Sequence, residues 1–546
     1  MKRKAVAAVL TAVMVASMFT GCGSDNGSSS AKSASAASAA SAANDTVDED
    51  GKVNGIMYQE GLPLVDEGDY TFSIFCDDSS ESGEFIMLDE FKKQTNVDVD
   101  LKIYPYETAT ERLNLDLNSG DYADVIGGWT LSDNAILTYG VNQGVFIPLE
   151  DYFEKYCPNI SAILDLPGVR EKMTAPDGHI YTIPYVCGDT TVGYSPYINT
   201  KWLENVGMSM PTTTDEFEAV LKAFKEQDAN GNGDASDEIP FSTDPNNKHI
   251  EAMAGYFGLP MNKLGIAIQD EKVVYGGVSN TYREFLSWFH KLYADGLVDV
   301  ELYTQDSSTW EGKGNQDLYG VSIAYGSNEF TGIPAAEERG DFDSMPVLNT
   351  DKGGIWLRDT EGFSVYRTQA VITNKAEHPE IICRWFDNAF ALENGIGCNR
   401  GPVGVIVNKE DDGYHAIDTT TLSEEDQEKY SWSNLWPQSL PKYLPADFEF
   451  VEEHPMYDEK KATEEAYEAN LTNEIIPSYW IDLDKIDTFS DTNTAIKDFF
   501  EQQQAQFVCG ELDIDNDADW QAYVDGMYSL GLEDWVATQG IEEIAK

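Results

Sequence analysis

A loop rich in side-chain oxygen atoms begins at residue 228. Such side chains occupy positions 1, 3 and 5 of the loop, and a glycine occupies position 6: Asp228, Asn230, Asn232 and Gly233. Alternate positions direct their oxygens inward at a hard cation, and the glycine allows a sharp turn, so the spacing matches the first half of an EF-hand-type calcium loop. Ile239 stands at position 12, where a bidentate carboxylate is needed, so Asp237 or Glu238 must supply that contact. A polar surface turn without a metal is the alternative.

Aromatic residues are numerous in the chain, with 11 Trp and 28 Tyr. An aromatic ring buries flat C–H patches such as those of a sugar, while planar polar side chains bond hydroxyl groups. We expect ligand contacts from residues in predicted loops or near predicted strand ends: Trp129, Asp78, Tyr185, Asp189, Trp310, Tyr325, Trp356, Arg358 and Trp436. Trp129 and Asp78 are the first candidates because each closely follows a predicted strand. For each aromatic residue, packing in a hydrophobic core is the alternative.

Signals of catalysis are absent from the sequence. The six histidines are dispersed, without an i, i+4 pair or an H-E-x-x-H pattern, and neither a G-x-S-x-G motif nor a P-loop occurs. We therefore expect no catalytic residues and no enzyme activity. With 96 Asp+Glu, a pair of carboxylates at glycosidase spacing keeps a surface glycoside hydrolase or lyase as the alternative.

The N-terminus reads as an export signal. Residues 1–4 are basic after Met1, residues 5–19 are apolar and uncharged, and Cys22 follows Thr20 and Gly21. A basic segment before a short apolar one is typical of a secretory signal peptide, and the apolar stretch is too short for the alternative of a membrane anchor. The small Ser and Ala residues from 23 to about 55 predict a flexible tether.

Six further cysteines are scattered along the chain: Cys76, Cys157, Cys187, Cys383, Cys398 and Cys509. They form no C-x-x-C pair, so no zinc site is indicated. We expect mostly free, buried thiols, and disulfides remain the alternative for an exported protein.

The elements around Asp78 and Trp129 alternate between strand and helix. Hydrophobic periodicity predicts strands at 70–75, 97–104 and 123–126 and helices at 84–93 and 110–117. This β-α-β-α-β order predicts a mostly parallel sheet covered on both faces, with ligands bound beyond the carboxyl ends of the strands. A further helix at 213–227, capped by Thr213 with Glu216, leads into the oxygen-rich loop.

The chain is long and strongly acidic. Its 546 residues contain 96 Asp+Glu against 36 Lys+Arg, a formal net charge of −60. Such a chain repels a phosphate backbone, so a nucleic-acid partner is excluded. Hydrophobic residues make up 42%, enough for a large core, and the length predicts two or more domains.

Three runs in fixed order carry a family resemblance: DGHIYTIPY at 177–185, YINTKWLE at 197–204 and PTTTDEF at 211–217. They resemble a run of extracellular solute-binding proteins that serve ABC importers, in particular the large oligosaccharide-binding lipoproteins. Runs at 61–65, 144–149 and 374–387 and the C-terminal segment also fit. Cys22 after Phe-Thr-Gly looks like a lipobox, in which the thiol is acylated.

The resemblance implies two α/β lobes joined by a hinge, with the ligand between them. By this analogy one lobe comprises 68–186 and 370–430, and the other comprises 187–369 and 431–546. A signal peptide at 1–21 and a lipidated tether at 22–67 precede them.

The resemblance also implies a structural calcium ion after the helix at 213–227. Carried over, side chains of five residues and the backbone carbonyl of Asp234 would bind it: Asp228, Asn230, Asn232, Asp237 and Glu238. This chain departs from the family pattern by one extra residue between Gly233 and Asp237.

The function that the resemblance implies is capture of an extracellular carbohydrate, in particular an oligosaccharide, and its delivery to membrane permease subunits. The protein would be a monomer, anchored by lipid at the outer face of the cell membrane. A peptide or another polar solute is the alternative ligand for the same fold.

Overall fold

The computed structural model describes residues 45–78, 84–188, 190–244, 250–332, 341–445, 448, 450–451, 455–541 and 543–545. Within these residues, no helix is both long enough and apolar enough to cross a lipid bilayer.

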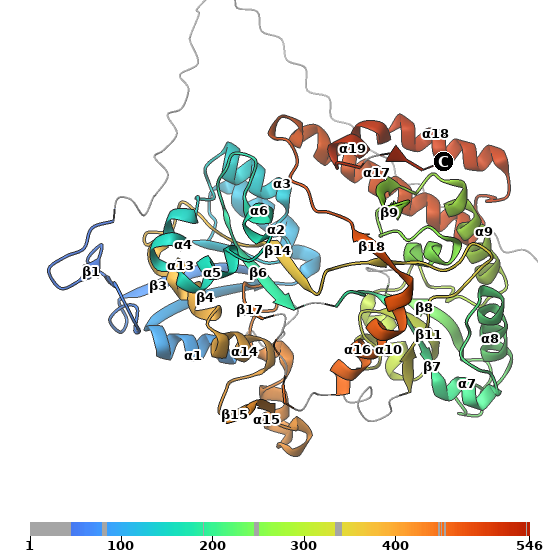
Figure 1. The fold of residues 1–546 in the computed structure, drawn as a ribbon, viewed down its shortest axis with the longest axis horizontal. Coiled ribbons are helices and arrows are strands. Elements are labelled where there is room, and N and C mark those ends of the chain that lie inside the picture. The colour runs from blue at the N-terminus through green and yellow to red at the C-terminus, as the bar shows by residue number, and fades with distance from the viewer. Residues whose placement is uncertain are drawn as a thin grey trace, which may run out of the picture. The chain divides into compact units, whose positions relative to one another are not determined.

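The first sheet has six strands in the order β17-β6-β14-β5-β3-β4. Their bounds are β3 (Tyr70–Asp77), β4 (Val97–Tyr104), β5 (Val125–Gly127), β6 (Thr182–Gly188), β14 (Phe363–Ile372) and β17 (Tyr443–Leu444). Figure 1 labels β3, β4, β6, β14 and β17. Neighbours are parallel except at β14, which is antiparallel to both β5 and β6. Helices α1 (Ile86–Thr95) and α2 (Tyr106–Ser119) connect β3, β4 and β5, so the predicted β-α-β-α-β order is confirmed.

Both faces of the first sheet are buried. Successive side chains of a strand point to opposite faces. Ile74 therefore joins a core with Trp385 of α13 (Pro379–Ala389), while Phe75 joins a second core with Leu113 of α2. The polar ends of these strands are left at the rim of the sheet, where a site can be built.

The second sheet has four strands in the order β12-β7-β11-β8. Their bounds are β7 (Ser195–Asn199), β8 (Ile239–Thr243), β11 (Tyr319–Ala324) and β12 (Phe342–Ser344). β11 is parallel to β8, and β7 is antiparallel to β11 and β12. The predicted helix is α8 (Thr214–Glu226), which buries its apolar stripe from Phe217 to Phe224. Thr213 caps it by accepting a 3.2 Å hydrogen bond from the N–H of Glu216.

The remaining helices and strands pack around the two sheets and form the C-terminal region. The helices are α3 (Asp133–Ala135), α4 (Glu150–Tyr156), α5 (Pro158–Leu164), α6 (Val169–Met173), α7 (Thr200–Val206), α9 (Asn280–Ala294), α10 (Ser307–Asn315), α11 (Asn328–Thr331), α14 (Leu392–Arg400), α15 (Glu424–Lys429), α16 (Pro455–Tyr467), α17 (Ile486–Cys509), α18 (Asp517–Ser529) and α19 (Leu532–Thr538). The smaller sheets pair β1 (Lys52–Val53) with β2 (Met57–Tyr58), β13 (Trp356–Arg358) with β18 (Leu471–Ile475), β15 (Val407–Glu410) with β16 (Gly413–Ala416), and β10 (Lys272–Tyr275) with β9 (Ile266–Gln269) and β19 (Glu543–Ile544).

Three elements lie on the other side of a predicted domain boundary from their partners. The two residues of β17 pair with β6, so this part of 431–546 belongs to the first sheet. β14 begins at Phe363, before the predicted boundary at 370. Val53 and Leu64 of the predicted tether are buried in the core of the first sheet, because these apolar side chains remove surface from water there.

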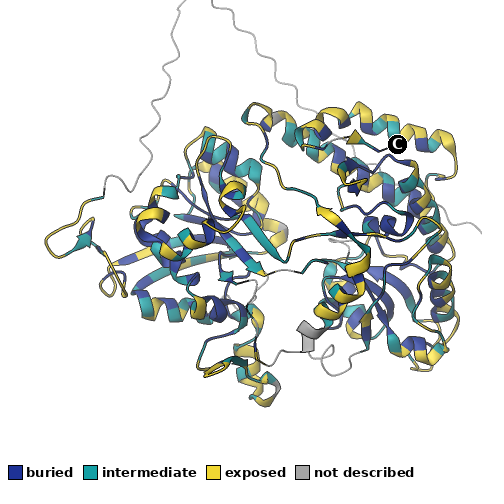
Figure 2. Ribbon diagram, in the orientation of Figure 1, coloured by how far each residue is buried: buried dark blue, intermediate teal, exposed yellow. Residues whose placement is uncertain are grey.

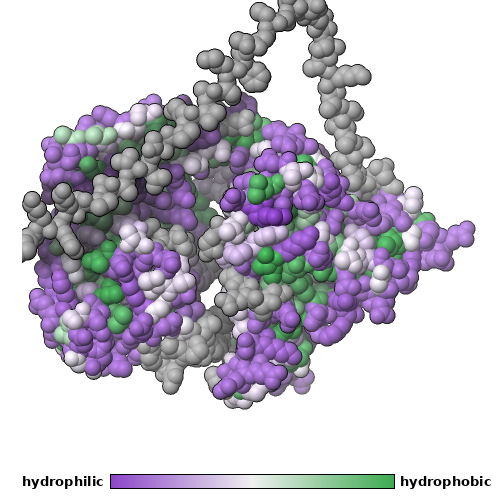
Figure 3. Space-filling view, turned by 180° about the vertical axis from the view of Figure 1, so that it is seen from behind, coloured by the Kyte–Doolittle hydropathy of each residue, from purple (hydrophilic) through white to green (hydrophobic). Residues whose placement is uncertain are grey.

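Strands are mostly buried, and helices expose one face (Figure 2). The face drawn in Figure 3 is largely hydrophilic, with hydrophobic residues in scattered patches, as the acid excess leads one to expect. The six cysteines of the described chain are free thiols, and four of them are buried: Cys76, Cys157, Cys383 and Cys398.

Candidate functional site

Asp77, the last residue of β3, holds the loop that follows β5. One carboxylate oxygen accepts a 2.9 Å hydrogen bond from the N–H of Trp129, and the other accepts from the N–H and hydroxyl of Thr130. A Cβ atom on Gly128 would collide with this carboxylate, and the φ of +131° at Gly128 also favours glycine. Asp77 is buried, while Trp129 stays 44% exposed. Asp77, at the end of β3, thus holds the loop in which the indole of Trp129 is exposed to solvent.

Trp129, which follows β5, is one end of a row of aromatic residues. Its ring meets Tyr366 edge-on, with centroids 5.3 Å apart. Tyr366 of β14 stands opposite Tyr185 of β6 in the antiparallel ladder, and the two rings stack at 5.4 Å. The ammonium of Lys442 lies 5.2 Å from the ring centre of Tyr185 and 5.8 Å from that of Trp432. We call Trp129, Tyr366, Tyr185 and Trp432 the aromatic row; Trp432 is 52% exposed.

Asp78 and Gln438 fix the loop that leads to Lys442. The carboxylate of Asp78, which is 3% exposed, accepts a 2.8 Å hydrogen bond from the N–H of Gln438. The Gln438 amide then accepts a 2.6 Å bond from Lys442 and donates a 2.9 Å bond to the carbonyl of Trp432. Lys442 is fully buried, and this burial lowers the pKa of its ammonium to about 8.

Polar residues also gather at the carboxyl ends of β8 and β11 in the second sheet. Asp244 follows β8 and Tyr325 follows β11. Tyr325 donates its N–H to Glu329 over 2.9 Å, and the ammonium of Lys460 lies 3.6 Å from its ring centre. Burial raises the pKa of Glu329, and Asp244 and Glu311 add repulsion. We call Asp244, Glu311 and Glu329 the acidic group.

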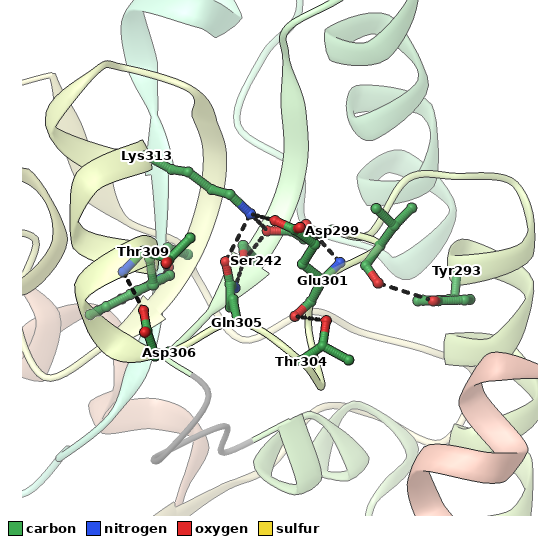
Figure 4. Close-up of polar contacts among 12 residues, drawn as sticks. Ser242, Tyr293, Asp299, Glu301, Thr304, Gln305, Asp306, Thr309 and Lys313 are labelled. Atoms are coloured by element: carbon green, nitrogen blue, oxygen red, sulfur yellow. Dashed lines mark hydrogen bonds and ion pairs between the residues drawn. The ribbon is translucent and has the colours of Figure 1, made fainter. Parts of the chain in front are cut away.

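An ion network anchors α10, the helix that carries Trp310 and Glu311 (Figure 4). The ammonium of Lys313 lies 2.9 Å from buried Asp299 and 2.8 Å from Glu301. Burial alone would lower the pKa of Lys313, but these partners outweigh it and the pKa is raised. The helix is thereby tied to the segment that follows α9.

The oxygen-rich loop is folded by hydrogen bonds between its own residues. Its inward turn is held by backbone N–H groups of Asn232, Gly233 and Asp234, which donate to side-chain oxygens within the loop. One oxygen each of Asp228 and Glu238 is buried and has no hydrogen-bond partner among the described residues. Burial raises the pKa of Glu238. Buried, unpartnered carboxylate oxygens among amide oxygens are a donor set that fits Ca²⁺.

Three of the predicted ligand residues lie in hydrophobic cores. Trp310 and Trp356 do not lie in loops, as predicted, but in α10 and β13. Trp310 is 3% exposed and bonds the hydroxyl of Ser322, and Trp436 is fully buried against Trp385. All three tryptophans pack in a hydrophobic core, which was the alternative to ligand contact, and the candidate site does not include them.

Of the other predicted residues, Arg358 ties β13 to β18 by bonding the backbone carbonyl of Thr472 over 3.1 Å. Asp189 and Cys22 lie outside the described residues. Trp129, Tyr185 and Asp78 come together at the first sheet, and Tyr325 lies at the second. Sequence reasoning missed several neighbours: Asp77, Tyr366, Trp432, Gln438, Lys442, Asp244, Glu329 and Lys460.

A family model described as bacterial extracellular solute-binding protein matches residues 78–395, more than half of the chain. The chain belongs to this family. A relative from Streptococcus pneumoniae, the fructooligosaccharide ABC transporter substrate-binding protein FusA, is 32% identical over 411 residues, covering 73% of this chain and 70% of the relative.

Solved structures agree with this assignment. FusA in complex with kestose matches with a TM-score of 0.75 at 27% identity, covering 86% of this chain and 98% of that chain. An EF-hand mutant of FusA in complex with fructo-nystose matches with a TM-score of 0.73 at 26% identity over the same shares, 86% and 98%. The predicted two-lobe α/β fold of a solute-binding protein is therefore confirmed.

Proposed function

We propose that the protein is the substrate-binding component of an ABC importer, and that it captures an extracellular oligosaccharide and delivers it to membrane permease subunits. The observation that carries this proposal is the aromatic row, which exposes Trp129 after β5 and Trp432 on the helical turn 432–434. The family and the name of the S. pneumoniae relative support it.

The row suits a sugar because an indole buries the C–H face of a ring and leaves the hydroxyls at its edge free. Groups that bond hydroxyls are supplied by the acidic group and by Lys460: Asp244, Glu311, Glu329 and Lys460. In open α/β sheets ligands bind beyond the carboxyl ends of strands, where Trp129, Asp244 and Tyr325 lie. We place the ligand between the two sets, with hinge closure around it.

The charge of the chain narrows the ligand class. A net charge of −60 repels polyanions, so a neutral oligosaccharide fits better than one rich in uronic acids. Since the S. pneumoniae structure holds kestose, fructo-oligosaccharides of that size are the first ligands to test.

We also propose that the oxygen-rich loop binds one structural Ca²⁺. Asp228, Asn230, Asn232, Asp237 and Glu238 would hold it by side-chain oxygens, and Asp234 by its carbonyl. The ion would neutralise the buried oxygens of Asp228 and Glu238 and fix the loop after α8. The existence of an EF-hand mutant of FusA supports this assignment.

The sequence signals at the N-terminus complete the proposal. Acylation of Cys22 would anchor the protein, as a monomer, at the outer face of the cell membrane, and two or more acyl chains give stable anchoring. The tether would let the folded part reach its ligand above the membrane.

The test is incubation of the purified protein with a panel of neutral oligosaccharides, uronic-acid oligosaccharides and peptides. Thermal unfolding measures binding, and chromatography of the incubated sugars measures cleavage. A raised Tm with a neutral oligosaccharide that is recovered intact supports the proposal. Released products would instead indicate a hydrolase or lyase, and a shift with peptides alone would exclude the sugar assignment.

A further inference from the structure

Lys442 is a buried cation that the packing of the fold does not account for. The residue is 1% exposed, and among the described residues its ammonium bonds the neutral amide oxygen of Gln438 and forms no ion pair with a carboxylate. Burying an ammonium without an ionic partner is unfavourable, and an apolar side chain would avoid the penalty. A charge retained in such a place, beside a ligand-facing surface, indicates a functional role.

The titratable and charged groups around this ammonium come from each element packed on it. They are Cys398 and Arg400 of α14, Cys187 of β6, and Asp78 after β3. Arg400 repels the ammonium, and Asp78 is held in a hydrogen bond to the backbone of Gln438. The ammonium donates to the Gln438 amide and lies over the rings of Tyr185 and Trp432.

These contacts hold Trp432 at two points. The ammonium lies over the indole ring, a cation–π contact, at 5.8 Å from the ring centre. Through Gln438 it also acts on the backbone, since the amide that accepts from Lys442 donates to the Trp432 carbonyl over 2.9 Å. Trp432 lies on a single helical turn, 432–434, and is 52% exposed, so few other contacts restrain it.

We propose that Lys442, as an ammonium, is the positioning residue of the aromatic row: it fixes Trp432 and Tyr185 in the arrangement that stacks on a sugar ring. This inference rests on the proposed function. It makes ligand affinity depend on the charge of one buried lysine that the ligand need not touch.

The charge gives the inference a direction with pH. Because burial lowers the pKa of Lys442 to about 8, the ammonium is present at pH 7 and largely lost at pH 9. Affinity should fall over this interval. The free energy of unfolding should rise over the same interval. The penalty of burying the charge is fully present below the folded pKa of Lys442, and it disappears as pH rises towards the pKa of an unfolded lysine, about 10.4. A loss of affinity with a gain in stability cannot come from unfolding.

The experiment is calorimetric titration of kestose, or of a panel sugar that binds, into the wild type and K442M at pH 7 and pH 9. The wild type should lose about two- to eightfold in affinity from pH 7 to pH 9. K442M should bind about 3- to 30-fold more weakly than wild type at pH 7 and show no change with pH. The control is K409M, which removes an exposed ammonium that lies 5.5 Å from the ring centre of Tyr414. This variant should have the wild-type affinity at pH 7 and the wild-type change in affinity between pH 7 and pH 9.

Tryptophan fluorescence gives a second measurement that needs neither ligand nor K442M. The difference in fluorescence intensity between the wild type and W432F reports on Trp432. This difference should change with pH, with a midpoint near pH 8. If the wild type binds sugar but keeps its affinity from pH 7 to 9, or if the fluorescence difference is flat, the positioning role is overturned. If no panel sugar binds while the fluorescence titrates, the proposed function fails and the positioning of Trp432 stands.

Discussion

The carboxylate of Asp77 accepts a 2.9 Å hydrogen bond from the backbone N–H of Trp129. The end of β3 therefore sets the position of the loop after β5, and with it one end of the aromatic row. Asp78 does the same for the loop at Gln438, which leads to the other end. Two consecutive aspartates thus organise a surface whose aromatic residues come from four distant parts of the chain.

Replacing Asp77 should disturb both stability and binding. In D77N, the amide has one acceptor oxygen where two are needed and brings a donor towards the N–H groups of the loop. We expect unfolding to become easier by about 1–3 kcal/mol, with weaker sugar binding because Trp129 is displaced. D69N, at an exposed position, is the matched control. Chemical denaturation and calorimetry measure the two effects; equal behaviour of D77N and D69N would contradict the role of Asp77.

The two exposed indoles should contribute to affinity more than to stability. We expect W129A and W432A each to lose about 1.5–3 kcal/mol of binding free energy, roughly tenfold to more than a hundredfold in Kd. Their Tm should stay close to the wild-type value because both side chains are about half exposed. Y528A removes another exposed aromatic residue, in α18, and should leave Kd unchanged. A wild-type Kd in both tryptophan variants would exclude the row as the binding surface.

Calcium should stabilise the folded protein. Removal of the ion by EDTA leaves the oxygens of Asp228 and Glu238 unneutralised, so Tm should fall and return on addition of Ca²⁺. At a hundredfold excess over Kd the expected stabilisation is about 2.7 kcal/mol. The variant D228N/E238Q should have a Tm that EDTA does not change. A wild-type Tm indifferent to EDTA, with no calcium in elemental analysis, would make the loop a plain turn.

The network beneath α10 should be a large contributor to stability. In K313M, buried Asp299 loses its ionic partner, and breaking such a pair costs about 3–5 kcal/mol. K272M breaks an exposed pair with Glu543 and should cost at most about 1 kcal/mol. Denaturant titration compares the two. Similar losses of unfolding free energy in K313M and K272M would contradict a larger contribution to stability from the buried pair.

Local pattern was enough to predict much of the fold. Alternation predicted β3 and β4, and the stripe from Phe217 to Phe224 predicted α8, because these elements bury one face by their own periodicity. β17 was missed because two residues carry no period, and their strand state comes from pairing with β6. β14 was missed because it mixes polar and apolar residues and crosses a boundary predicted by analogy.

The candidate site was predictable in part. Trp129 and Asp78 were named because each closely follows a predicted strand, and Tyr185 was named with them. Asp77 and Asp244 could have been found by the strand-end rule. Tyr366, Trp432 and Lys442 could not, because their contacts join segments far apart in sequence. Trp310 and Trp356 were misplaced because the residues around them are mostly polar or glycine, as in loops, and their burial comes from contacts with distant segments.

The most direct test of the account is calorimetric titration of neutral oligosaccharides, kestose first, into the calcium-loaded protein and into W129A/W432A. We expect saturable one-to-one binding to the wild type, recovery of intact sugar, and at least a hundredfold weaker binding to the double variant. No binding by any sugar of the panel, or the same Kd in both proteins, would contradict oligosaccharide capture by the aromatic row.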